Sequence, residues 1–135
     1  MRQVPVLWPV MEALRIEATA KTPAVRFEPA KGELEVAGCS IHENADGFYS
    51  PLWEKVDAYC AAPVARTSVK VKLDYFNSSS AKYLLDIFKR LDDLHATGGS
   101  KVTLEWYFDE GDLDMQEAGN DYKGLLDMPV KVLER

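Results

Sequence analysis

One stretch decides the fold of this chain: Thr67-Ser68-Val69-Lys70-Val71-Lys72-Leu73-Asp74-Tyr75-Phe76-Asn77-Ser78-Ser79-Ser80-Ala81-Lys82. Apolar and polar residues alternate over 67–75, which predicts a strand that is buried on one face. The predicted buried face carries Val69, Val71, Leu73 and Tyr75. Three serines follow the strand, and we expect a helix to leave them over residues 80–96. The junction between strand and helix therefore carries an unusual number of hydroxyl groups.

The predicted helix over 80–96 is strongly amphipathic. One stripe of side chains recurs at spacings of three and four residues, as on one face of a helix. It consists of the apolar residues Ala81, Leu84, Leu85, Phe88, Leu91 and Leu94, and it ends at His95. Gly98-Gly99 is a typical signal for the end of a helix, and residues 101–107 alternate again as a strand. The segment 67–107 therefore predicts a parallel β-α-β unit, whose crossover should be right-handed.

The elements on either side extend this unit to an order of β-β-β-α-β-α-β-α-β. Alternating patterns predict strands over 14–19 and 128–133 and a hairpin over 24–38. A helix is expected from near residues 42–47, with an apolar face of Phe48, Leu52, Trp53, Val56, Tyr59 and Cys60 and an end at Pro63, and a short helix is expected within 109–121. This order favours an α/β (α+β) fold with a mixed sheet of five to six strands packed against helices, similar to STAS domains in general character.

The length and charge of the chain limit its function. A chain of 135 residues fits one domain, which we place at 14–135. Residues 1–13 are an extension, and Met11 is a candidate second start. The net charge is −6 and the pI about 4.9, which disfavours nucleic acid and anionic membranes as partners because both attract Lys and Arg. Two isolated cysteines and the lack of a signal peptide or membrane segment indicate a cytoplasmic protein.

The serine run allows three interpretations. Asn77 or any of Ser78, Ser79 and Ser80 can cap the helix by accepting a hydrogen bond from a backbone N–H. A phosphate there would carry a charge of about −2 at neutral pH, and the free N–H groups and dipole of a helix start stabilise anions. A serine nucleophile would need a nearby base. Since His95 lies ~22 Å away along the same helix, at ~1.5 Å per residue, we expect no hydrolase site and no catalytic residue.

The acidic stretch 109–121 is the second candidate site. An EF-hand loop starting at Asp112 would need Gly at its sixth position and Glu at its twelfth, but Glu117 and Lys123 stand there. We therefore expect a solvated or protein-docking face, with no metal and no cofactor. Two alternatives stay open: a small metal-dependent enzyme that uses the carboxylates of 109–121, and a constitutive scaffold whose serines only cap the helix.

Several short motifs, taken together in their order and spacing, resemble one protein family. They are Ile16-Glu17-Ala18-Thr19 with Thr22-Pro23, His42-Glu43-Asn44-Ala45 with Phe48-Tyr49-x-Pro51-Leu52, Tyr75-Phe76-Asn77-Ser78-Ser79-Ser80-x-Lys82, and Trp106-Tyr107-Phe108-Asp109-Glu110 with Asp114-Met115 and Gly119-x-Asp121. The chain is similar, over residues 14–134, to the SiaC-type regulatory phosphoproteins of bacteria.

This resemblance implies a non-enzymatic partner switch in signal transduction. Such proteins are phosphorylated in their Asn-Thr/Ser-Ser-Ser segment by a cognate Ser/Thr kinase, and a metal-dependent Ser/Thr phosphatase reverses the modification. The unphosphorylated form binds and activates a diguanylate cyclase, which raises cyclic di-GMP and favours biofilm. By position, Ser78 is the implied phosphoacceptor, with Ser79 and Ser80 as alternatives. The expected partner-binding residues around it are Asp74, Tyr75, Asn77, Ser79, Ser80 and Lys82.

Overall fold

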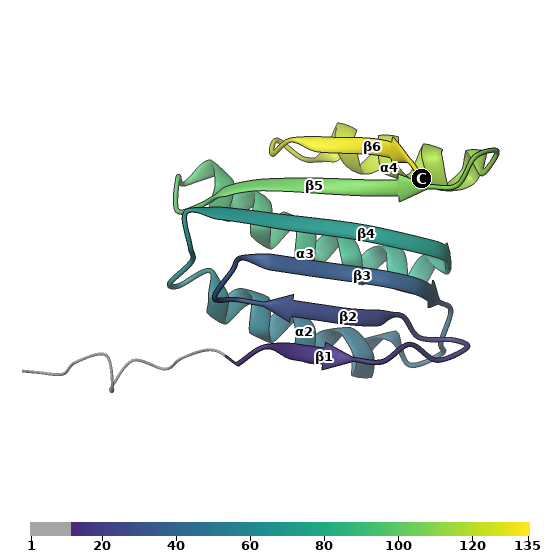
Figure 1. Cartoon of the computed structure of the whole chain (residues 1–135), viewed down its shortest axis with the longest axis horizontal. Coiled ribbons are helices and arrows are strands. Elements are labelled where there is room, and N and C mark those ends of the chain that lie inside the picture. The colour runs from purple at the N-terminus through teal and green to yellow at the C-terminus, as the bar shows by residue number, and fades with distance from the viewer. Residues whose placement is uncertain (1–11) are drawn as a thin grey trace, which may run out of the picture.

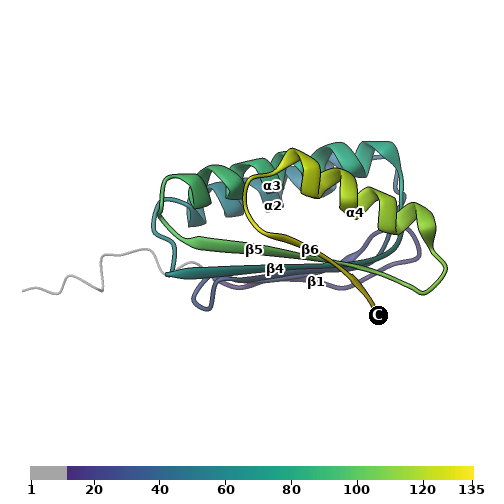
Figure 2. The ribbon, with the colours of Figure 1, turned by 90° about the horizontal axis from the view of Figure 1, so that it is seen from above.

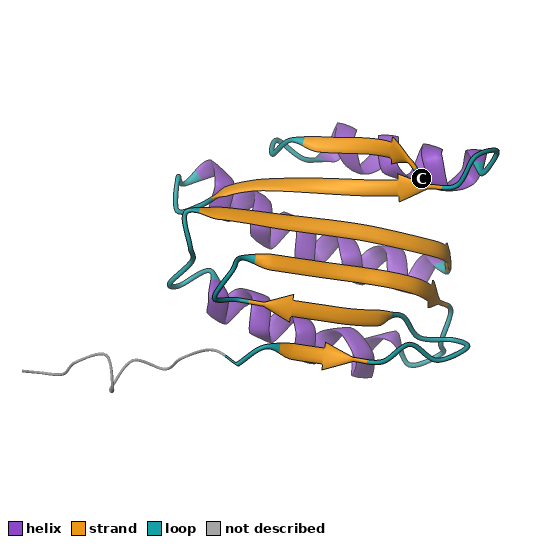
Figure 3. Cartoon of the chain, in the orientation of Figure 1, coloured by secondary structure: helices purple, strands orange, loops and turns teal. Residues whose placement is uncertain are grey.

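The computed structural model describes residues 12–135 and contains the predicted element order (Figures 1 and 3). The elements are β1 (Leu14–Ile16), β2 (Ala24–Glu28), β3 (Glu33–Ser40), α2 (Ala45–Tyr59), β4 (Arg66–Phe76), α3 (Ser78–Ala96), β5 (Lys101–Phe108), α4 (Leu113–Leu125) and β6 (Val130–Glu134). The α/β class with a mixed sheet is therefore confirmed. The first strand is shorter than the predicted 14–19, and most of the predicted extension over 1–13 lies outside the described residues.

The six strands lie in the sheet in the same order as in the sequence. β1, β2 and β3 pair antiparallel, whereas β3 with β4, β4 with β5, and β5 with β6 pair parallel. Each parallel connection passes through one helix. Because such crossovers are right-handed and the sheet grows in one direction, all of the helices must fall on the same face. Figure 2 shows α2, α3 and α4 together on one side of the sheet.

The core lies between the sheet and this single layer of helices. The alternating strands place their apolar side chains inward, so Val69, Val71, Val102 and Leu104 are fully buried. The other face of the sheet carries charged side chains in place of a second helix layer. This asymmetry matches the period-2 patterns of the sequence, since a strand buried on both faces would read as a continuous apolar run.

The two longest helices bury slightly different faces from those predicted. In α2 the buried stripe is Ala45, Tyr49, Leu52, Val56 and Tyr59, whereas Phe48 and Trp53 are only partly buried. In α3 the prediction omitted Ile87, which is buried. Tyr49 was not in the predicted apolar face, which placed Phe48 there instead. A buried tyrosine satisfies its hydroxyl group with a partner, and here the partner is Ser40 at 2.6 Å.

Tyr75 is a clear departure from the predicted pattern. We expected it to share the buried face of Val71 and Leu73, but it is 62% exposed. The cause is a bulge in the pairing of β3 with β4, where Gly38 pairs with Leu73 and Cys39 already pairs with Tyr75. Asp74 is the extra residue, and a bulge breaks the alternation of faces beyond it. The end of β4 therefore presents Asp74 and Tyr75 to solvent.

Among the described residues, no helix combines the length and the hydrophobicity that crossing a membrane requires. The longest helix, α3, has 19 residues, and it carries charged side chains along its outer face.

Candidate functional site

The serine run lies where the parallel strands β3 and β4 end. The topology brings the loop after β3 beside the start of α3, although the two are far apart in the sequence. The backbone N–H of Asn77 donates to the Ser40 carbonyl oxygen at 3.0 Å. Its side-chain amide lies 3.4 Å from the His42 carbonyl oxygen, to which it donates. Functional sites are common at the carboxyl ends of the strands in a parallel sheet. Here the two hydrogen bonds of Asn77 hold the start of α3 against the end of β3 and the segment that follows it.

Asn77 is the residue that caps α3. Its backbone is extended, with φ −93° and ψ 172°, and its side-chain oxygen accepts a hydrogen bond from the Ser80 N–H at 2.9 Å. The helix therefore begins at Ser78, two residues before the predicted start. Ser78 and Ser79 occupy the first turn, where N–H groups have no intrahelical partner. Neither Ser78 nor Ser79 is the cap of α3, because Asn77 takes that role.

The three serines differ sharply in accessibility. Ser80 is completely buried, and its hydroxyl donates to the Ser40 carbonyl oxygen at 2.9 Å and accepts from the Ser40 hydroxyl at 2.7 Å. Ser78 and Ser79 are exposed. Ser78 and Ser79 are thus accessible to solvent in the folded protein, whereas Ser80 is a structural residue. One sequence signal points to this, because Ser80 precedes Leu84 by four residues and so shares its buried stripe.

The remaining predicted partner-binding residues gather on the surface around this junction. Asp74 and Tyr75 are exposed at the end of β4, and Lys82 is exposed on the first turns of α3. Asp74 accepts a hydrogen bond from the Arg135 guanidinium at 2.6 Å. Arg135 was not among the predicted site residues, since only the fold brings residue 135 next to β4.

Arg135 connects the ends of the neighbouring strands. It donates to Asp109 at 2.8 Å and to the Lys72 carbonyl oxygen at 3.2 Å, in addition to Asp74. Its hydrogen bond to Asp109 raises the pKa of the Arg135 guanidinium, and the charge of Asp74 adds to this effect. Hydrogen bonds from Arg135 therefore hold the carboxyl ends of β4 and β5 together, close to the serine run.

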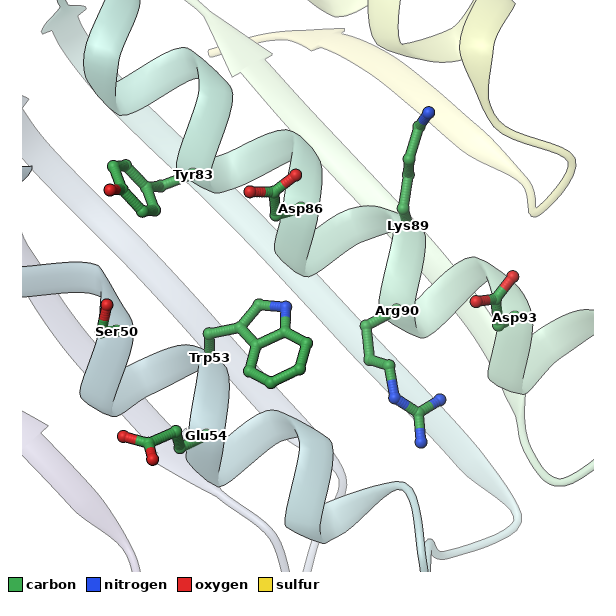
Figure 4. Close-up of a pocket in the computed structure, with 8 residues that line it drawn as sticks. All are labelled: Ser50, Trp53, Glu54, Tyr83, Asp86, Lys89, Arg90 and Asp93. Atoms are coloured by element: carbon green, nitrogen blue, oxygen red, sulfur yellow. The ribbon is translucent and has the colours of Figure 1, made fainter. Parts of the chain in front are cut away.

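A groove runs along the outer surface between α2 and α3, and sequence reasoning missed it (Figure 4). Its volume is about 630 Å³. It is lined by Ser50, Trp53, Glu54, Tyr83, Asp86, Lys89, Arg90 and Asp93, and we call it the α2/α3 groove. The groove depends on the packing of two helices, and the partial burial of Trp53 was not visible in a pattern that placed it in the core.

The end of the α2/α3 groove closest to Ser78, which we call its near end, is connected to the serine run by side-chain contacts. Tyr83 donates its hydroxyl to Asp46 at 2.6 Å, which raises the pKa of the Tyr83 phenol. The Tyr83 ring also stacks on Tyr49, with 6.0 Å between ring centroids. Tyr49 in turn is hydrogen-bonded to Ser40, the partner of Ser80. A continuous set of contacts therefore joins the first turn of α3 to the groove.

Neither histidine is hydrogen-bonded to a serine of the run within residues 12–135. His42 is buried, and neither of its ring nitrogens has a hydrogen-bond partner among the described residues, so no serine is paired with it as a nucleophile would be. His95 accepts from the Val102 N–H at 3.0 Å and has a structural role. Within residues 12–135 no three His, Cys, Asp or Glu side chains converge as metal ligands. The carboxylates of 109–121 instead lie around α4, with Asp112 as its cap.

The family of the chain follows from a comparison with known proteins. A family model described as SiaC family regulatory phosphoprotein matches residues 16–135. The chain belongs to the SiaC family. The resemblance inferred from the short motifs is thereby confirmed, whereas the phosphoacceptor and the partner-binding residues stay predictions.

Solved structures of SiaC proteins agree with this assignment. Apo-SiaC from Pseudomonas aeruginosa is 26% identical, with a TM-score of 0.85 over 91% of this chain and 99% of that chain. A crystal structure of the diguanylate cyclase SiaD in complex with its activator SiaC, from the same organism, contains a chain that is 25% identical, with a TM-score of 0.85 over 90% and 99%. An uncharacterised protein of Pseudomonas aeruginosa strain UCBPP-PA14 is 27% identical over 122 residues, or 90% of this chain and 96% of that protein.

Proposed function

We propose that this protein is a non-enzymatic regulator whose binding to a diguanylate cyclase is controlled by phosphorylation of Ser78. The unphosphorylated form binds and activates the cyclase, raising cyclic di-GMP and favouring biofilm. Membership of the SiaC family supports this proposal, as does the complex in which a similar SiaC protein is the activator of SiaD.

The observation that carries the proposal is the contrast between Ser80 and its two neighbours. Ser80 holds the start of α3 in place through its buried hydrogen bonds, while Ser78 projects an exposed hydroxyl from the same turn. A phosphate on Ser78 can therefore be added without breaking the packing below. The free N–H groups of the first turn and the helix dipole stabilise such an anion.

Lys82 adds a reason to prefer Ser78 over Ser79. It lies four residues after Ser78, so the two side chains share one face of α3. An ammonium group in that position can pair with a phosphate on Ser78 and increase its stability. Ser79 is instead four residues before Tyr83, whose hydroxyl is already engaged by Asp46.

The phosphate would release the partner by changing the surface at the start of α3. A dianion next to the exposed Asp74 and Tyr75 enlarges the surface and must be desolvated before a partner can pack against it. We propose that a cognate Ser/Thr kinase adds this phosphate and that a metal-dependent Ser/Thr phosphatase removes it. We also propose a cytoplasmic location, where the nucleotide substrates of a kinase and a cyclase are found.

The test uses the full chain with its cognate kinase and cyclase. Peptide mass spectrometry should find phosphate on wild-type protein and on Ser79→Ala, and none on Ser78→Ala. Phosphorylated wild-type protein should bind the cyclase at least ~10-fold more weakly, equivalent to about 1.4 kcal/mol. A phosphate on another residue would reject Ser78 as the switch. Equal cyclase affinity for Ser78→Asp, the phosphorylated protein and the wild type would favour the constitutive scaffold.

A further inference from the structure

We infer that the α2/α3 groove binds one segment of the cyclase, and that this segment carries basic side chains together with an apolar side chain. This inference rests on the proposed function, because it assigns the surface on which that partner docks. The groove has the volume of a typical binding site, about 630 Å³, and it begins within one or two turns of the serine site. Its chemistry indicates what it accepts.

Two aromatic side chains provide the apolar part of the groove. Trp53 projects from α2 toward α3, and Tyr83 lies at the near end (Figure 4). Both are only partly buried. Trp and Tyr are enriched among residues that dominate binding energy, because they bury a large area with few rotatable bonds. Tyr83 is also held in place by its hydrogen bond to Asp46 and its stacking on Tyr49, so ordering it costs little on binding.

The charges of the groove favour a basic partner. Glu54 and Asp86 are exposed, and neither forms a salt bridge with another residue in the range 12–135. The main cation facing them, Arg90, is already paired with Asp57 at 2.7 Å. Lys89 points away from Trp53 (Figure 4). The lining therefore carries three carboxylates against two cations, and the carboxylates of Glu54 and Asp86 have no salt bridge among the described residues. Lys or Arg from a partner could pair with them.

The distance between the groove and Ser78 gives the two sites different roles: the groove contributes affinity for the cyclase, and phosphorylation of Ser78 controls whether the cyclase binds. Tyr83 lies five residues beyond Ser78, and Asp93 fifteen, which are ~7.5 Å and ~22 Å along the helix axis. A phosphate on Ser78 thus borders the near end of the groove. Most of the groove lies beyond the screening length of about 8 Å in physiological salt. The phosphate acts by contact with the bound partner, while the groove supplies attraction that hardly changes with phosphorylation.

The occupant is a partner protein rather than a second copy of this chain. The chain has a net charge of −6, so a second copy would bring mostly like charges to an acidic groove. Self-association that depends on the groove would overturn this part of the inference.

The experiment measures cyclase affinity of the full chain at low and at high salt. The variant Glu54→Lys/Asp86→Lys reverses both unpaired carboxylates. Glu17→Lys/Asp127→Lys is a control with the same change of charge, because both residues are exposed and lie outside the groove, the serine run and the stretch 109–121. We expect the double variant to bind at least ~10-fold more weakly and with a flatter salt dependence, and the control to bind like wild type. Circular dichroism and thermal unfolding show that each variant is folded. Unchanged affinity of the double variant would overturn the inference.

A second measurement uses a synthetic probe and does not depend on the cyclase. A short amphipathic Leu/Lys peptide should change the tryptophan fluorescence of wild-type protein, and its Leu/Glu counterpart should not. Trp53→Phe should remove the fluorescence change. Glu54→Lys/Asp86→Lys should weaken peptide binding, whereas the control Glu17→Lys/Asp127→Lys should not. Peptide binding that is equal in all three variants would place the basic segment elsewhere and overturn the inference.

The two proposals fail in different ways. If Ser78→Asp weakens cyclase binding but the groove variants do not, the switch stands and the groove assignment is wrong. If the groove variants weaken binding but phosphorylation has no effect, the docking surface stands and the switch is wrong. Loss of dimers in the groove variants, measured by light scattering with cyclase affinity unchanged, would identify a second copy as the occupant.

Discussion

Single residues at the start of α3 have separate tasks despite their similar chemistry. Asn77 caps the helix, Ser80 anchors it to Ser40, and Ser78 and Ser79 face solvent. The division follows from helical geometry, because residues one and two apart point in different directions. A run of three serines thus combines one structural hydroxyl with two that are exposed to solvent.

Replacing the buried serine should destabilise the protein far more than replacing its exposed neighbour. Ser80→Ala removes hydrogen bonds to Ser40 and leaves a buried carbonyl group with one partner fewer, so we expect a loss of about 1–3 kcal/mol. Ser79→Ala should change the free energy of unfolding by less than about 0.5 kcal/mol. Urea denaturation measures both, and equal effects would contradict the assigned structural role of Ser80.

At the scale of elements, α4 shows how closely a helix can approach the sheet. Gly119 lies against Trp106 of β5, and a Cβ atom built on Gly119 would come within 2.5 Å of the indole. Trp106 also donates its ring N–H to the Met115 carbonyl oxygen at 2.9 Å. The helix therefore lies almost directly on the tryptophan, and it needs a glycine at that one position.

Two glycines of α4 should respond to alanine in opposite ways. Gly119→Ala would overpack against Trp106, which costs about 1–3 kcal/mol and outweighs the better helix propensity of alanine. Gly124→Ala meets no atom within 4 Å and should stabilise the protein by up to about 1 kcal/mol. Thermal unfolding of the two variants tests this contrast. A stabilised Gly119→Ala variant would show that α4 lies farther from β5.

At the scale of the whole molecule, the sheet has one covered face and one charged face. On the open face Arg26 contacts Glu28, Glu33 and Glu35, and Lys72 continues the series at 3.6 Å from Glu35. These charges keep the open face soluble without a second layer of helices. The hydrogen bond from Arg26 holds the pKa of the Glu28 carboxyl below its usual range.

The open face should therefore make stability depend on acid pH. A carboxyl whose pKa is lowered by folding stabilises the protein above its unfolded pKa, about 4.3, and this contribution disappears as the pH falls through the folded value. Arg26→Met should thus destabilise the protein more at about pH 6 than at about pH 3. Arg66→Met is the control, since Arg66 is exposed and has no salt bridge within residues 12–135. An Arg26 effect that is equal at both pH values would contradict this account.

The sequence by itself determined the element order, the fold class and the family. Strands such as β4 alternate because one face is buried, and α3 repeats its apolar residues with the helical period, so local patterns report the fold directly. The motif around Asn77 and Ser78 also marked the candidate site, because capping and phosphate binding both depend on local chemistry at a helix start.

Only the tertiary structure decided which groups are accessible and which distant groups meet. The bulge that exposes Tyr75 depends on pairing with β3, and the burial of Ser80 depends on Ser40, forty residues away. Arg135 reaches Asp74 across the sheet edge, and the α2/α3 groove exists because two helices pack side by side. Such contacts depend on strand register and helix packing, which local patterns do not encode. The spacing of Ser80 from Leu84 places Ser80 on the buried stripe of α3, but it does not identify Ser40 as its partner.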